Sequence, residues 1–300
     1  MTDPRVSVVV ATNRVSPYLR EALESAVAQT HPAVDILVVD DGSPDAAAVA
    51  AAASAVGART VRIPPSGVSI ARNVGAAEVT GDYVVFLDDD DRWHPERLRR
   101  QVAALEEDPG AVASYCGMRT VDATGRRELA PADQVAVTSR LDVARRITGI
   151  ILPNLVIRRA SFDAVGGFHS RLALAEDLDL VLRLAERGSF AFVPERLVDY
   201  RATSTNTTRR HRELTRSIDR VLRLHRWSAV ERGDAELVAA FDESLRGNAR
   251  FAWWGASRRA RSSLRERHPA AAAGELWWAL RTAPGGLLDG LARRASRRAR

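Results

Sequence analysis

Four consecutive aspartates, Asp88–Asp91, are the clearest candidates for chemistry in this 300-residue chain. Two like charges about 4 Å apart repel by ~4 kcal/mol at an effective dielectric constant near 20, so a fixed cluster of this kind favours a bound cation. Oxygen ligands suit Mg²⁺ or Mn²⁺, which take one or two carboxylates and complete their coordination with water and substrate phosphates. The cluster therefore predicts a divalent-metal site for a diphosphate. The alternative is a solvated acidic turn that caps the next helix.

Three further groups could contribute to such a site. Asp40 and Asp41 could accept hydrogen bonds from a pyrimidine base or from ribose hydroxyls, or they could simply begin a turn. Arg72 could hold a diphosphate through a bidentate contact, although with 44 arginines in the chain an arbitrary one is usually a surface residue. Glu176 and Asp177 stand at a predicted helix start, where carboxylates either cap the helix or act as a general base on a hydroxyl.

Short β-branched runs alternate with helical patterns in the first third of the chain and place these motifs. Such an alternation favours a doubly wound α/β sheet with helices on both faces, whose ligand site lies beyond the carboxyl ends of the strands. Both acidic clusters directly follow a strand, so we expect them to share one crevice. The predicted strands cover residues 5–11, 35–39, 59–63 and 83–87.

The rest of the chain has a mixed pattern and then a helical one. Helices are predicted over 95–107 and 176–187, and strands over 111–118, 155–158, 190–193 and 197–201. From residue 209 onward, arginine-rich amphipathic helices continue to the end, with an interruption at His268-Pro269. The polar stretch at 205–208 separates the two patterns. It predicts an α/β domain over residues 1–208 and a helical region over 209–300.

Composition excludes several classes of protein. A hydrophobic content of 46% suits a globular chain with a sizeable core, and the single cysteine, Cys116, excludes an intramolecular disulfide. Neither a secretory signal nor a spanning segment is evident, which predicts a cytoplasmic protein, at most peripheral on the membrane. The net charge of +6 is concentrated in arginines near the end, where it could attract nucleic acid, anionic lipid or anionic substrates.

Four motifs, taken together and in this order, resemble glycosyltransferase family 2 over residues 5–201. They are VSVVVATNR (6–14), ILVVDDGSPD (36–45), SGVSIARNVGAAEVTGDYVVFLDDDDRW (66–93) and GGFHSRLALAEDLDLVLRLAERG (166–188). The resemblance implies a GT-A fold and transfer, with inversion, from a nucleotide-diphosphate sugar to a hydroxyl acceptor. The acceptor would be a glycan, a lipid-linked glycan or a small molecule, in the synthesis of cell-surface polysaccharide, glycolipid or another glycan.

The resemblance also implies roles for individual residues. Asp88 and Asp90 match the outer carboxylates of the Asp-x-Asp motif that binds Mn²⁺ or Mg²⁺, with Asp90 as the direct ligand. Asp177 corresponds to the catalytic base, and Glu176 to its neighbour in the acceptor site. The residues assigned to the nucleotide-sugar are Ala11, Asn13, Asp41, Arg72 and Asp89, with Asp41 at the base.

The chain departs from the family pattern at two places. Family members commonly read Pro-Thr-Tyr-Asn after the first strand, whereas Ala11-Thr12-Asn13 lacks the proline and the aromatic residue, so stacking on the base is not expected there. His169 replaces an often acidic residue, which indicates either a different acceptor or a surface contact.

Two other functions remain open on sequence grounds. A sugar-phosphate nucleotidyltransferase would carry a glycine-rich, basic loop after its first strand, where this chain offers only Arg14. A non-catalytic protein could bind nucleic acid through the basic tail, but the α/β part lacks interleaved aromatic and basic residues, and no specific nucleic-acid partner is predicted.

The tryptophans of the C-terminal region allow two interpretations. The pairs at 253–254 and 277–278, with Arg281 and the run at 293–300, could form an interfacial surface attracted to anionic lipid. Alternatively, they pack helices together while the arginines stay in water.

Overall fold

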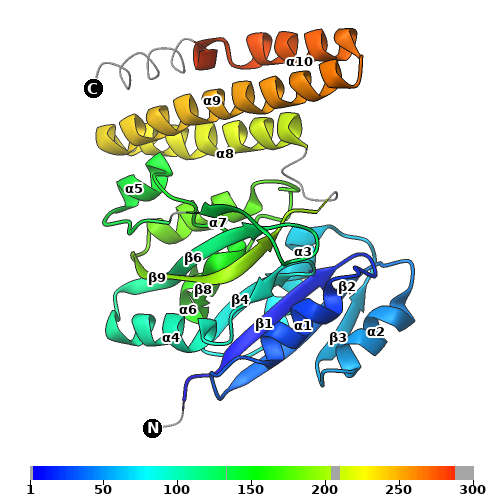
Figure 1. Ribbon diagram of the computed structural model, residues 1–300. Helices are drawn as coiled ribbons and strands as arrows, with labels where there is room; N and C mark the ends of the chain where they lie inside the picture. Colours follow the sequence, from blue (N-terminus) through cyan, green and yellow to red (C-terminus); the bar gives the residue numbers. More distant parts are fainter. Residues whose placement is uncertain (1–2, 133, 204–209, 288–300) are drawn as a thin grey trace. The chain divides into compact units, whose positions relative to one another are not determined.

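The computed structural model describes residues 3–132, 134–203 and 210–287, and a nine-stranded mixed sheet organises its first part (Figure 1). The strand order is β3-β2-β1-β4-β8-β6-β9-β5, with β7 paired to β6. The chain divides into two compact units, Met1–Ser204 and Thr205–Arg300, and each is described by itself. The predicted boundary at 205–208 lies outside the described residues.

The first half of the sheet is parallel and confirms the predicted alternation of strands and helices. Its strands are β1 (Val6–Thr12), β2 (Val34–Asp41), β3 (Arg59–Ile63) and β4 (Tyr83–Asp88). The helices between them are α1 (Leu19–Val27), α2 (Ala46–Ser54) and α3 (Val68–Ala77). The register pairs Ala11 of β1 with both Val39 and Asp88, so these strands end at one edge.

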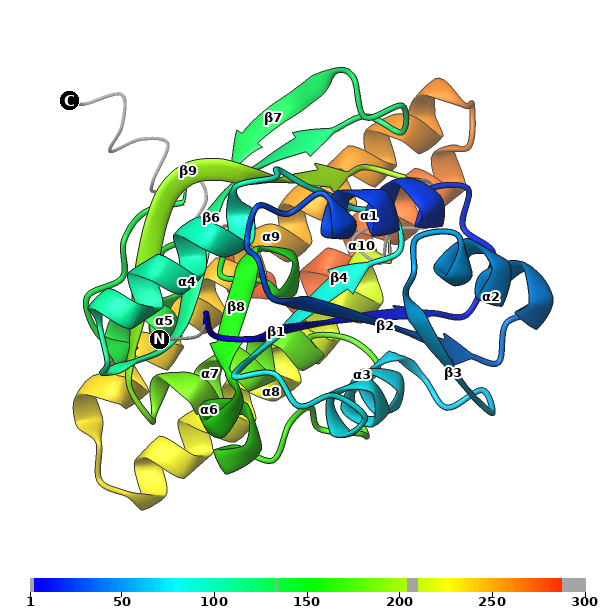
Figure 2. The same cartoon turned by 90° about the horizontal axis from the view of Figure 1, so that it is seen from below.

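Helices cover both faces of the central parallel strands β1 and β4, which explains why these strands are mostly apolar rather than alternating. Val8 and Val10 share a core cluster with Leu19 and Leu23 of α1 on one face. On the other face α3 approaches so closely that a Cβ on Gly75 would lie 2.3 Å from Val9. Figure 2 shows α1 and α3 on opposite sides of these strands.

The second half of the unit adds further helices, and strands in both parallel and antiparallel pairing. The elements are β5 (Arg92–Trp93), α4 (Arg97–Glu107), β6 (Ala111–Val121), β7 (Glu128–Ala132), α5 (Arg140–Arg145), a 3₁₀ turn η1 (Leu152–Asn154), β8 (Leu155–Arg158), α6 (Arg159–Ala164), α7 (Glu176–Ala185) and β9 (Ser189–Arg201). The two strands predicted at 190–193 and 197–201 form the single strand β9. Its pairing with β6 shifts register between Cys116, which faces Val193, and Gly117, which faces Arg196. Pro194, which cannot donate to a regular ladder, lies in this irregularity.

The second unit is helical, as predicted for the C-terminal region. It consists of α8 (His211–Glu231), α9 (Ala235–Arg265) and α10 (Pro269–Thr282), and α9 packs against both others. Pro269 occupies the first turn of α10, where a missing N–H is tolerated, and this explains the interruption seen in the sequence. Among the described residues, no helix is long and apolar enough to cross a bilayer.

Candidate functional site

Arg72 connects the two groups of acidic residues that the sequence singled out. It lies on α3 with only 6% of its surface exposed. Its Nη2 donates to Oδ1 of Asp88 at the end of β4, and its Nη1 donates to Oε1 of Glu176 at the start of α7, both over 2.7 Å. The guanidinium also lies 5.5 Å from the centre of the Phe168 ring. One buried cation therefore holds the predicted metal-binding strand next to the predicted acceptor helix.

The aspartates after β4 lie in different surroundings. Asp89 accepts hydrogen bonds from the Thr12 hydroxyl (2.6 Å) and from Nη2 of Arg14 (3.0 Å), so it is tied to the end of β1. Among the residues that the structure describes, the Asp90 side chain has only long contacts, to Arg14 at 3.5 Å and to the Thr203 hydroxyl at 3.4 Å. Burial, and then the charges of Asp88 and Asp89, raise the pKa of Asp90 to about 6. The described residues thus balance the negative charge of Asp88–Asp91 incompletely.

Arg201, at the end of β9, contacts the turn formed by Asp88–Asp91, which we call the aspartate turn. The sequence did not predict this contact. Its backbone N–H donates to Oδ1 of the buried Asp91 (2.9 Å), and its Nε donates to the carbonyl of Asp90 (2.8 Å). Its Nη2 donates to Glu21 (2.6 Å), and its guanidinium stacks 4.5 Å from the ring of Tyr18. Only folding brings it there, because about 110 residues separate it from the turn.

A divalent cation is compatible with this turn if a ligand completes its coordination. Among the described residues, no three His, Cys, Asp or Glu side chains form a ready-made metal site. Mg²⁺ and Mn²⁺ commonly use only one or two carboxylates together with phosphate oxygens and water. Asp88, whose side chain is 34% exposed, and Asp90, whose pKa is raised, fit that arrangement. Asp91 also has one buried oxygen, Oδ2, without a hydrogen-bond partner.

The start of α7 presents Asp177 beside Glu176. Burial, and then the charge of Glu176, raise the pKa of Asp177 to about 6. The backbone N–H of Leu178 donates to Asp177 Oδ1 over 2.7 Å and opposes this shift. Ala175 precedes the helix with a φ of 62°, in the left-handed region that costs a residue with a Cβ about 1 kcal/mol or more. Arg146, which sequence reasoning also missed, lies within electrostatic range of Asp177.

Asp40 and Asp41 at the end of β2 are engaged by the protein. The buried Asp41 accepts the backbone N–H groups of Ser66 (2.6 Å) and Gly67 (2.9 Å), one on each oxygen. It therefore fixes the loop that leads into α3. Asp40 accepts the N–H of Ser43 over 2.7 Å and pairs with Arg62.

Ala11 and Asn13 lie at the end of β1, on either side of Thr12. Ala11 is half-buried and Asn13 is exposed. The Thr12 hydroxyl, rather than either neighbour, makes the contact with Asp89.

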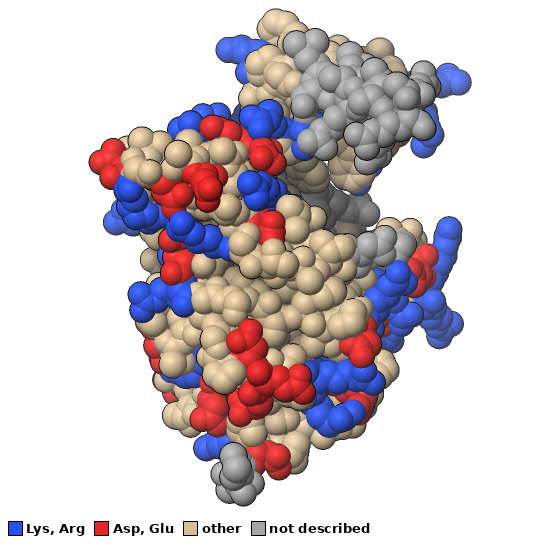
Figure 3. Space-filling view, turned by 90° about the vertical axis from the view of Figure 1, so that its left-hand side faces the viewer, with Lys and Arg blue, Asp and Glu red and all other residues tan. Residues whose placement is uncertain are grey.

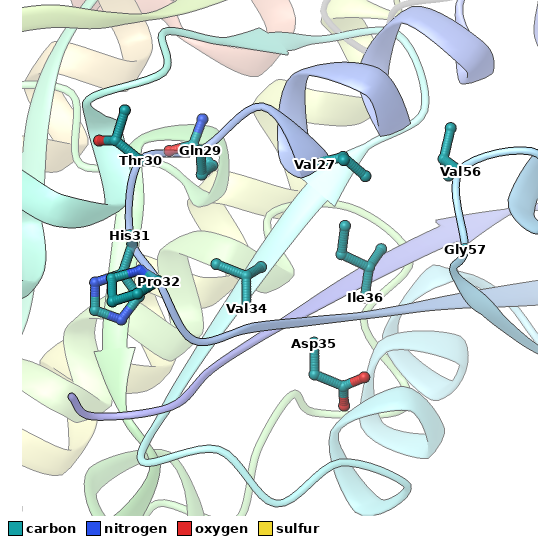
Figure 4. Close-up of a pocket in the computed structure, with 10 residues that line it drawn as sticks. All are labelled: Val27, Gln29, Thr30, His31, Pro32, Val34, Asp35, Ile36, Val56 and Gly57. Atoms are coloured by element: carbon teal, nitrogen blue, oxygen red, sulfur yellow. The ribbon is translucent and has the colours of Figure 1, made fainter. Parts of the chain in front are cut away.

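A separate pocket of about 440 Å³ lies at the amino-terminal end of β2, and Figure 4 shows the side chains around it. Its lining includes His31, Pro32 and Asp35, and it contains none of the predicted site residues. Asp35 pairs with Arg59 over 3.1 Å. Because ligand sites of such sheets lie at the carboxyl ends of the strands, this pocket is not the candidate site.

The family model "Glycosyl transferase family 2" matches residues 7–166, more than half of the chain. The chain belongs to glycosyltransferase family 2. An uncharacterized glycosyltransferase from Rickettsia typhi is 27% identical over 216 residues, covering 69% of this chain and 66% of the relative. One from Haemophilus influenzae is 28% identical, covering 62% and 63%. The matches thus span slightly less than two thirds of these family members.

Solved structures agree with the GT-A fold expected from the sequence. S. aureus TarS 1–349 in complex with UDP-GlcNAc superimposes with a TM-score of 0.61 at 15% identity, covering 89% of each chain. The mannosyltransferase PcManGT from Pyrobaculum calidifontis, in complex with GDP-Man and Mn²⁺, gives a TM-score of 0.60 at 20% identity, covering 98% of this chain and 80% of that one. At such identities the likeness concerns the fold alone.

Proposed function

We propose that this family 2 protein transfers a glycosyl group from a nucleotide-diphosphate sugar to a hydroxyl acceptor, with inversion and with Mn²⁺ or Mg²⁺. The observation that carries the proposal is the contact of buried Arg72 with both Asp88 and Glu176. A diphosphate held at Asp88 and an acceptor held at α7 would then be neighbours. Their reacting atoms would meet without a large rearrangement, which lowers the entropic part of the barrier.

The donor half of the proposal assigns the diphosphate to the aspartate turn. Asp88 and Asp90 would hold a divalent ion, which would supply charge neutralisation for the departing nucleoside diphosphate. Arg72, already between two carboxylates, adds a fixed positive charge on the same side. The proposed remaining contacts to the nucleotide-sugar come from Ala11, Asn13, Asp41 and Asp89. UDP-GlcNAc bound to TarS and GDP-Man bound to PcManGT support this class of donor.

The acceptor half of the proposal assigns proton removal to Asp177. With a pKa of about 6, its carboxylate is mostly ionised at neutral pH yet more basic than an ordinary aspartate. It would take the proton of the acceptor hydroxyl as the oxygen attacks the anomeric carbon from the side opposite the diphosphate. That direction of attack inverts the configuration. Glu176, held by Arg72, positions the start of α7.

Exchange of Asp177 for Asn tests the proposal. The substitution keeps the size and the hydrogen bond from Leu178 but removes the base, so transfer should fall by about 100-fold or more while donor binding remains. Glu186→Gln, at the exposed residue that directly follows α7, is the matched control. Transfer would be measured with a panel of sugar nucleotides chosen by thermal shift. Asp177→Asn protein that turns over like the control would refute the assignment.

A further inference from the structure

The two tryptophan pairs of the second unit are divided between its core and its surface. Trp253 donates its ring N–H to the carbonyl of Ala283 over 2.7 Å, and Trp278 is only 7% exposed. Their neighbours point outward, with Trp254 53% and Trp277 60% exposed. Packing therefore explains one member of each pair and leaves the other member to be explained.

The two outward tryptophans differ in what they contact. Trp254 stacks on Phe251 at 5.9 Å between ring centres and is covered by the guanidinium of Arg258 at 4.2 Å. Trp277 has no ring, cation or hydrogen-bond contact within the described residues 3–132, 134–203 and 210–287. A large apolar ring left in this way indicates a surface with another partner.

The outward side of α10 is apolar along its length. Exposed Ala273, Leu276, Trp277 and Leu280 follow the spacing i, i+3, i+4, i+7 and form one stripe, which we call the α10 face. The opposite side of the helix is also apolar, because Ala272, Trp278 and Ala279 are buried in the unit. A helix that is apolar on both sides is normally covered on both, so water is an unfavourable neighbour for the α10 face.

Exposed arginines lie at both ends of the α10 face. Arg265 ends α9, Arg267 precedes α10, and Arg281 lies in its last turn. None of the three has an ion pair within the part of the chain that the structure describes. Arginines around an apolar stripe that carries a tryptophan are typical of helices that lie in the headgroup region of an anionic bilayer.

The positive charge of the chain is also concentrated in the second unit. Residues 205–300 carry 21 of the 44 arginines but only 10 of the 38 acidic residues. The first unit, in contrast, has more acidic residues than arginines, and Figure 3 shows the two kinds interspersed on one of its faces. The positive charge of the protein is thus carried by the second unit.

We infer that the α10 face binds the surface of an anionic lipid bilayer. Trp277, Leu276 and Leu280 would enter the boundary between headgroups and acyl chains, and the flanking arginines would contact lipid phosphates. Nucleic acid would satisfy the arginines but leave the leucines in water. A second copy packed symmetrically on this face would bring arginines against arginines. The inference does not depend on the proposed glycosyl transfer, so either can fail alone.

Vesicle flotation of the full chain tests the inference. We expect flotation with phosphatidylcholine vesicles that contain 30% phosphatidylglycerol, and little with phosphatidylcholine alone. Exchange of Arg265, Arg267 and Arg281 together for Gln should lower the partition coefficient by on the order of 100-fold at low salt. The control removes the same charge from exposed arginines of the first unit, Arg126, Arg127 and Arg187. A control that loses binding equally, or an α10 variant that keeps it, overturns the inference.

Fluorescence separates apolar insertion from simple charge attraction. Brominated lipids should quench the wild-type protein, and Trp277→Phe should lose most of this quenching while the other five tryptophans provide the baseline. Unchanged quenching in Trp277→Phe contradicts the inference. If the protein does not bind vesicles, two other results would also contradict the inference. One is a dimer that dissociates when Leu276→Ala and Trp277→Ala are combined, and the other is binding to a DNA duplex. Far-ultraviolet circular dichroism verifies that each variant is folded.

Discussion

Removing the Arg72 guanidinium from between Asp88 and Glu176 is the perturbation whose effect on stability follows most directly from the structure. Arg72→Met keeps most of the apolar stem but removes the guanidinium, which lies over Phe168 and is the shared partner of Asp88 and Glu176. Breaking a buried ion pair by removing one partner typically costs about 3–5 kcal/mol. Because the Asp88 side chain is 34% exposed, water compensates part of this loss. We therefore expect the free energy of unfolding to fall by about 3 kcal/mol.

Urea denaturation at pH 7 in a chelator, followed by circular dichroism, measures this change. Arg20→Met is the control, because Arg20 is an exposed arginine whose ion pair with Glu24 is also exposed. The control should not differ measurably from the wild type. A loss of less than about 1 kcal/mol in Arg72→Met, the range of an exposed pair, would refute the view that Arg72 is the electrostatic centre of the site.

Two further predictions concern the acid limb of activity and the aspartate turn. Since the carboxylate of Asp177 must be ionised to act as a base, kcat/KM for transfer should fall about tenfold per pH unit below its pKa of about 6. Above that pH kcat/KM should level off. A flat profile between pH 5 and 7 would contradict this prediction. Arg201→Met keeps the backbone N–H bond to Asp91 but removes the Nε hydrogen bond to the Asp90 carbonyl and the positive charge beside Asp91. Donor affinity in Mn²⁺ should therefore fall by about tenfold or more, as for other groups that orient metal ligands. Titration calorimetry would compare the donor affinity of Arg201→Met with that of Arg196→Met, a control in the same strand. Equal affinities would show that Arg201 has no positioning role.

The parallel strands could be predicted because each depends on a short apolar run in the sequence. Valine-rich runs such as Val6–Val10 are stable only where both faces are covered, and helices α1 and α3 cover them. The single strand β9 could not be predicted, since Pro194 argues against a continuous strand until a register shift accommodates it.

The candidate site was predictable in its residue types but not in its connections. Strand ends placed Asp88 and Asp41 at one edge, yet no local pattern shows that Arg72 reaches Glu176, 104 residues away. Arg201 is likewise delivered by the fold rather than by a motif. The tryptophan pairs show the same limit, because adjacent residues on a helix point about 100° apart and packing alone decides which of them is buried.

Donor binding with and without a divalent ion tests the central claim most directly. Titration calorimetry would compare the wild-type chain and Asp90→Ala, each in Mn²⁺ and in chelator, with the sugar nucleotide that stabilises the wild type most. We predict measurable binding for the wild type in Mn²⁺, and at least about tenfold weaker binding in the other three conditions. Equal affinity of Asp90→Ala in chelator and wild type in Mn²⁺ would contradict a metal-held diphosphate at this turn.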